Sequence, residues 1–182
     1  MEQSTQAEAT RVHSPLVMDS APHTPARKRP DPVPQAASVT MLDELGVKPL
    51  SREHWTMDRS SVTFVQITPT LSLVASCGPG HPQSRSFYAA HAPTSCAGPD
   101  SVIFWDLSGL LSTDLSVVST VLGVGKTHRH RIARVHMFYR SPLIGMAVTV
   151  GNVALGGLIQ LHREADPFHD ALREAANSST KN

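Results

Sequence analysis

The sequence predicts an α/β domain in which an N-terminal strand pair precedes parallel strands that alternate with helices. The runs at 61–68 and 101–107 are β-branched or continuously apolar, which is typical of buried strands. Apolar residues at helical spacing follow each later strand. Crossovers of that length pair the strands in parallel and make right-handed connections, so a sheet covered by helices is expected.

The composition divides the chain between residues 54 and 55. All Phe, Tyr and Trp residues lie from Trp55 onward, and half of the 14 prolines lie within the first 50 residues. A segment this poor in large apolar side chains cannot offset its chain entropy by burial, so we expect 1–54 to be a disordered tail. Within it, 38–47 could form a short helix that ends at Gly46. Residues 55–177 are then the folded domain.

The first half of that domain is the less regular one. Residues 61–68 alternate, and Pro69 ends the strand. Residues 71–76 are either its hairpin partner or the start of a helix. Four prolines interrupt 77–100, which we expect to be mostly loop with a short helix at 84–91.

The second half repeats a strand and a helix three times. After the strand at 101–107, a helix contains Leu115 and Leu122, and Gly123 and Gly125 predict its end. The remaining predicted elements are a strand at 132–139, a helix from Ser141-Pro142 to Gly156-Gly157, a strand at 158–162 and a helix capped by Asp166-Pro167.

Charge and composition narrow the class of protein. The formal net charge of +1 argues against a wholly basic nucleic-acid binder. Two cysteines exclude a disulfide scaffold and suit a reducing compartment. The polar start MEQSTQAEAT lacks the pattern of a signal peptide, and no apolar run reaches the roughly 18 residues of a membrane span. We therefore expect a cytoplasmic protein that has no contact with a membrane.

A motif in the central strand and the following helix carries a family resemblance. Asp106 ends the predicted strand and Asp114 stands eight positions later, at the predicted helix start. This order and spacing resemble the STAS domain of anti-sigma-factor antagonists and sulphate-transporter tails, over 100–176 and more loosely over 55–76. The resemblance implies a non-catalytic module, without a cofactor, that binds a protein partner in a bacterial regulatory or signalling pathway.

The motif departs from the family at the residue that matters for regulation. In the family, the first Ser of Asp-Ser-Ser-Gly accepts phosphate from a kinase, but this chain has Leu115 there and keeps only the second serine, Ser116. Leucine has no hydroxyl, so the usual phosphoswitch cannot operate at that position. The resemblance still implies a partner or switch surface, which comprises Asp106, Ser112, Asp114, Leu115 and Ser116.

A basic segment offers an alternative function. No acidic residue lies between Asp114 and Glu164. The candidate basic face, which would serve a nucleic-acid-associated regulator, comprises Lys126, Arg129, Arg131 and Arg134. We favour a solvated loop here over a nucleic-acid site, because the segment lacks interleaved aromatic residues for base stacking.

Two further motifs are weaker candidates. Gly123–Thr127 ends like a phosphate loop and would suit a small nucleotide-binding protein, but Thr120 stands where a Walker A motif needs glycine. The set Cys77, His81, His91 and Cys96 could hold zinc, but its spacing matches no standard zinc site. We therefore assign no metal, no cofactor and no catalytic residue, and expect that the protein is not an enzyme.

Overall fold

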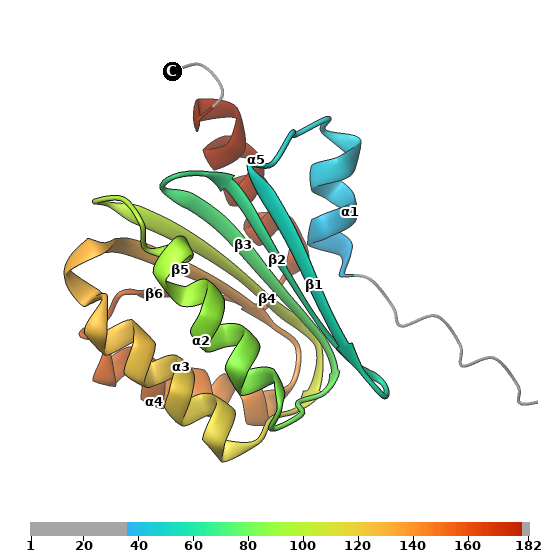
Figure 1. Cartoon of the computed structure of the whole chain (residues 1–182), viewed down its shortest axis with the longest axis vertical. Coiled ribbons are helices and arrows are strands. Elements are labelled where there is room, and N and C mark those ends of the chain that lie inside the picture. The colour runs from blue at the N-terminus through green and yellow to red at the C-terminus, as the bar shows by residue number, and fades with distance from the viewer. Residues whose placement is uncertain (1–35, 180–182) are drawn as a thin grey trace, which may run out of the picture. The chain divides into compact units, whose positions relative to one another are not determined.

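The computed structural model describes residues 36–179, which form a six-stranded sheet in the order β1-β2-β3-β4-β5-β6 (Figure 1). The strands are β1 (Ser51–Met57), β2 (Ser60–Thr68), β3 (Leu71–Pro79), β4 (Ser101–Ser112), β5 (Ile132–Tyr139) and β6 (Ile159–His162). The β1–β2 and β2–β3 pairs are antiparallel, and the pairs from β3 to β6 are parallel. The predicted fold class is confirmed, and 71–76 belongs to a strand.

Helices cover both faces of this sheet. They are α1 (Ala37–Glu44), α2 (Ser84–Ser95), α3 (Leu115–Thr127), α4 (Pro142–Ala154) and α5 (Ala165–Ser179), with one 3₁₀ turn at Arg129–Arg131. Each crossover from β3 to β6 steps in the same direction across the sheet, so right-handed connections place α2, α3 and α4 on one face. The helices α1 and α5 pack on the other face (Figure 1). No helix of residues 36–179 has the length and apolar character needed to cross a membrane.

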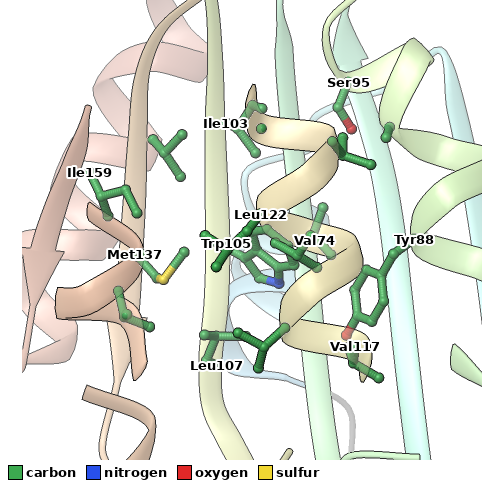
Figure 2. A pocket seen from close by; sticks show the side chains of 18 of the residues that line it. Val74, Tyr88, Ser95, Ile103, Trp105, Leu107, Val117, Leu122, Met137 and Ile159 are labelled. Carbon is green, nitrogen blue, oxygen red and sulfur yellow. The ribbon is translucent and has the colours of Figure 1, made fainter. Parts of the chain in front are cut away.

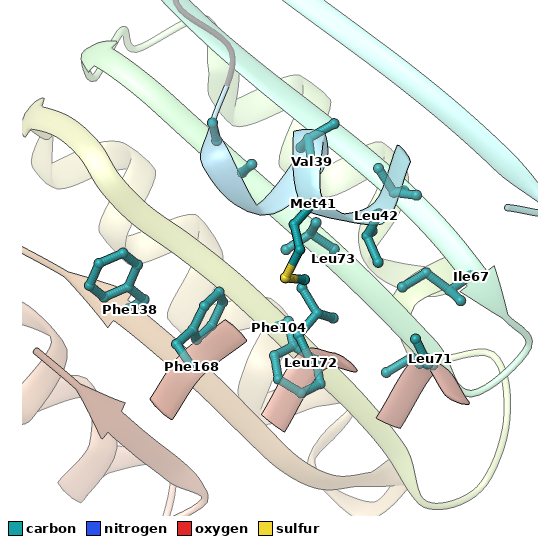
Figure 3. Packing of buried hydrophobic residues seen from close by; sticks show 14 of the residues in the cluster. Val39, Met41, Leu42, Ile67, Leu71, Leu73, Phe104, Phe138, Phe168 and Leu172 are labelled. Atoms are coloured by element: carbon teal, nitrogen blue, oxygen red, sulfur yellow. The ribbon is translucent and has the colours of Figure 1, made fainter. Parts of the chain in front are cut away.

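The core between the sheet and α1 and α5 includes residues that the sequence assigned to the tail. Val39 and Leu42 of α1 are buried in one core cluster that also contains Phe104 of β4 and Phe168 of α5 (Figure 3). The folded part therefore begins before the predicted boundary at 54 and 55, and β1 crosses that boundary. Aromatic residues from distant strands supply the apolar partners that α1 itself lacks. The expected helix at 38–47 is present, whereas the tail prediction for 1–35 lies outside the described residues.

Two predicted ends of elements are wrong, and both involve glycines. The β4 strand continues beyond Leu107, because Gly109 lets it pass close to Cys77, where a Cβ atom would lie only 2.6 Å from the Sγ atom. The α3 helix contains Gly123 and Gly125 and ends only at Thr127. A Cβ atom on Gly125 would lie 3.1 Å from Leu155, so this glycine permits a close approach between the helix and the segment after α4.

Candidate functional site

The start of α3 gathers four of the five residues of the predicted partner surface. Asp114 is the N-cap of the helix, and its Oδ1 atom accepts hydrogen bonds from the backbone N–H of Ser116, at 2.7 Å, and from the Ser116 hydroxyl. These bonds hold the pKa of Asp114 below its usual range. Leu115 is 84% exposed and Ser112 is also exposed. The site therefore presents an apolar side chain to solvent, while the serine hydroxyl of the motif is already engaged.

Asp106, the fifth predicted residue, lies in the interior. It is fully buried in the middle of β4, where Oδ2 accepts a hydrogen bond from the Ser38 hydroxyl and Oδ1 accepts one from the backbone N–H of Ser108. The prediction that Asp106 contributes to a partner surface is wrong, because β4 does not end at this residue. The carboxylate instead connects α1 to the sheet.

The outer side of α4 is an exposed apolar surface that the sequence analysis did not single out. Leu143, Met146, Val150 and Val153 are 72, 68, 69 and 81% exposed. Their spacing places all four on one side of the helix. The buried residues of the same helix are Ile144, Gly145, Val148 and Gly151. The helix thus carries larger apolar side chains toward solvent than toward the sheet. The sequence did contain one indication of this apolar surface, since the thirteen residues of α4 include no charged side chain.

Positive charge borders this apolar surface. Near the C-terminal end of α4, the Arg129 Nε atom donates a 3.1 Å hydrogen bond to the Leu155 carbonyl, and Lys126 lies beside the same turn. Near its N-terminal half, the Arg163 Nε atom donates a 3.2 Å bond to the Tyr139 hydroxyl, and the Tyr139 ring packs against Gly145. In the sequence, no acidic residue lies between Asp114 and Glu164, the interval that contains these cations.

The predicted basic face divides between the two sides of the sheet. Lys126 and Arg129 lie beside α4. On β5, Arg134 follows an irregularity in the pairing with β4, and its guanidinium donates to Gln160 of β6 at 3.3 Å. The alternation of β5 places Arg134 on the same side as His136 and Phe138, which is the α5 side. The residues named for a nucleic-acid site therefore do not form one continuous surface.

Neither weaker motif assembles a site. Gly123–Thr127 is the last part of α3, where a phosphate loop would have to precede its helix. Cys77 belongs to the core on the α1 side of the sheet and Cys96 to the core on the other side. The His91 ring stacks on Phe64 with 4.9 Å between the ring centroids. Within the described part of the chain, no three metal-binding side chains come together.

Comparisons with known proteins address the fold. No family model and no curated protein matches this chain. A similar solved structure is an uncharacterized protein of the DUF3478 family, with a SpoIIAA-like fold, from Shewanella loihica PV-4. The two are 15% identical with a TM-score of 0.47, and the match covers 67% of this chain and 92% of the other.

Proposed function

We propose that this domain is a non-catalytic protein-interaction module of a regulatory pathway, and that it binds its partner through α4 and the start of α3. We call this surface the docking face; it comprises Leu115, Leu143, Met146, Val150 and Val153. Parallel strands direct the first turns of their following helices to one edge of the sheet, so Leu115 and Leu143 lie at the same end of the two helices.

The single observation that carries this proposal is that the larger apolar side chains of α4 point to solvent rather than toward the sheet. Isolated exposed apolar residues are ordinary, whereas a contiguous apolar stripe usually marks an interaction site. Full burial of a Leu, Met or Val side chain contributes about 1.5–3 kcal/mol. A partner that covers the four outer residues of α4 would therefore gain most of its affinity from this helix.

The charge around the docking face specifies the kind of partner. Lys126, Arg129 and Arg163 favour a protein that combines an apolar ridge with carboxylates. A second copy of this chain would place the same cations opposite one another, which disfavours self-association through this face. The two carboxylates of the sequence motif weigh against a catalytic role, since Asp106 is enclosed and Asp114 caps a helix.

A pair of matched variants tests the proposal. Val150→Glu places a charge in the docking face, and Leu50→Glu places one on an equally exposed apolar residue, 65% accessible, in the segment before β1. Proteins captured from an extract of the source organism would be quantified by mass spectrometry, and the purified partner titrated calorimetrically. We expect Val150→Glu to weaken binding at least tenfold and Leu50→Glu to leave it unchanged. A partner that binds the two variants equally well would contradict the docking face.

A further inference from the structure

The α3 helix stands away from the sheet that it covers. Although six of its thirteen residues are Leu or Val, Val117 is its only buried residue. A cavity of about 150 Å³ lies beneath it, bounded by α2, α4 and the sheet (Figure 2). Beside larger residues such as Leu122 and Ile144, the helices line the cavity with the short side chains of Val121 and Ala147 and with Gly151. Four apolar side chains of α4 point to solvent instead. Small inward residues thus leave the space that a larger core side chain would fill.

The wall of this cavity is apolar and partly aromatic, with Trp105 and Met137 from the sheet and Tyr88 from α2. In Figure 2, Trp105 lies at the centre of the wall, with Tyr88 on one side and Met137 on the other. The rings of Tyr88 and Trp105 are tilted by 46°, with 5.6 Å between their centroids. Two flat surfaces set at an angle suit a planar, ring-shaped ligand.

The polar side-chain groups of Tyr88, Ser95 and Trp105 in the wall are already paired or covered. The Tyr88 hydroxyl pairs with the Ser76 hydroxyl at 2.9 Å, and the Ser95 hydroxyl donates to the His91 carbonyl at 3.2 Å. The Trp105 Nε1–H has no acceptor among the described residues, but neighbouring side chains cover it. These three groups offer a charged ligand no partner that would replace its hydration, which makes its entry unfavourable.

We propose that this cavity is a binding site for a small, uncharged, largely apolar molecule about the size of one substituted benzene ring. An apolar cavity of about 150 Å³ accommodates a molecule such as benzene. The α3 helix can move aside to admit such a molecule, because its Val, Thr and Gly residues make it a weak helix with little burial to lose. This site is independent of the docking face and does not rest on the proposed protein partner.

The test uses Trp105 as its reporter. In a Trp55→Phe variant, Trp105 is the only tryptophan, so its fluorescence can be followed while ethylbenzene or benzoate is added. We expect a saturable change and a higher Tm with ethylbenzene, and neither effect with benzoate, which has a similar ring but a charge. The same Tm comparison in the unsubstituted protein guards against an effect of Trp55→Phe on folding. Absence of saturable binding up to the solubility limit of ethylbenzene, or equal binding of benzoate, would overturn the proposal.

Two valine substitutions locate the binding. Val121→Phe fills the cavity from α3 and should abolish the response to ethylbenzene, whereas Val150→Phe adds the same ring on the outer side of α4 and should leave the response intact. Ala147→Leu is a second cavity-filling variant in case Val121→Phe does not fold. Ethylbenzene binding that persists in a folded cavity-filling variant would place the ligand elsewhere and refute this site.

Discussion

The Ser38 hydroxyl donates a 2.6 Å hydrogen bond to the Oδ2 atom of Asp106, across 68 residues of sequence. Both side chains are fully buried, and the second carboxylate oxygen is occupied by the Ser108 N–H. This pair attaches the first described helix to the central strand of the sheet. The motif aspartate that opened the family resemblance thus has a structural role in this chain.

Removal of the serine hydroxyl should destabilise the domain. Ser38→Ala leaves a buried carboxylate oxygen without its donor, which costs about 1–3 kcal/mol of unfolding free energy. Urea denaturation followed by circular dichroism would measure the loss. Thr40→Ala, at an exposed position of the same helix, controls for changes in helix propensity and should have a much smaller effect. Equal losses in the two variants would mean that the buried bond contributes nothing.

The Ser38–Asp106 pair also shows why the sequence misplaced the domain boundary. A count of aromatic residues measures only what a segment contributes itself. Val39 and Leu42 are buried in a core that also contains Phe104 and Phe168 from far along the chain. Local patterns did predict the parallel strands and most helices, because the spacing of apolar residues in a strand or a helix is visible within a short stretch of sequence. Contacts between distant segments leave no such local trace.

The docking face escaped prediction for a related reason. The Ser141-Pro142 start of α4 was readable, since cap and proline act within one turn. The sequence does not predict which side of α4 packs against the sheet, because every side of the helix is apolar. An amphipathic helix reveals its inner face through its polar residues, and α4 has too few of them.

A negative charge at Ser116 should weaken partner binding without unfolding the domain. Ser116→Asp removes the hydroxyl that donates to Asp114 and places two carboxylates together at the edge of the docking face. Repulsion from an acidic partner would then lower the affinity, by an expected factor of about ten. Calorimetric titration of the partner would measure it, with Ser119→Asp, on an exposed residue one turn further along α3, as the control.

Leu115→Ser restores a residue that the STAS family has at this position but should not restore regulation. The change removes an apolar side chain that is 84% exposed, so we expect weaker partner binding and an unchanged Tm. Mass spectrometry after incubation with a kinase-competent extract would detect any phosphate at residue 115. A phosphorylated variant whose partner binding responds to that phosphate would contradict this expectation.

Acid should destabilise the domain through a pair of stacked histidines. His136 and His162 are buried, with 3.1 Å between the Nδ1 atom of the first and the Nε2 atom of the second. Burial, followed by the charges of His162 and Arg134, lowers the pKa of His136 to about 4, and burial also lowers the pKa of His162. The unfolded chain therefore binds more protons between pH 6.5 and 4, so stability should fall as the pH decreases through this range.

A substitution at one of these histidines isolates their contribution. Each unit of pKa difference corresponds to about 1.4 kcal/mol, so the loss on acidification should be readily measured by urea denaturation at several pH values. His136→Phe keeps a ring stacked on Phe104 but removes one titrating group. We expect a shallower dependence of stability on pH in this variant. An unchanged slope would assign the acid sensitivity to other groups.

For a substitution at a glycine of α3, the sequence pattern and the structure predict changes in stability of opposite sign. If Gly123 ended the helix, as the pattern suggested, replacement by alanine would remove a favourable stop. In the structure Gly123 lies inside α3 with ordinary helical backbone, and a Cβ atom there would meet nothing within 4 Å. Gly123→Ala should therefore stabilise the domain by about 0.5–1 kcal/mol, because alanine loses less conformational entropy on folding.

Gly46 supplies the matched control for this substitution. It follows α1 with a φ of +66°, and a Cβ atom there would likewise meet nothing within 4 Å, so the two glycines differ in backbone conformation and not in available space. Gly46→Ala should destabilise the domain by about 1 kcal/mol, since an L-residue is strained at positive φ. Thermal and urea denaturation of the two variants should thus shift in opposite directions. A loss of stability in Gly123→Ala would show that α3 ends at this glycine in solution.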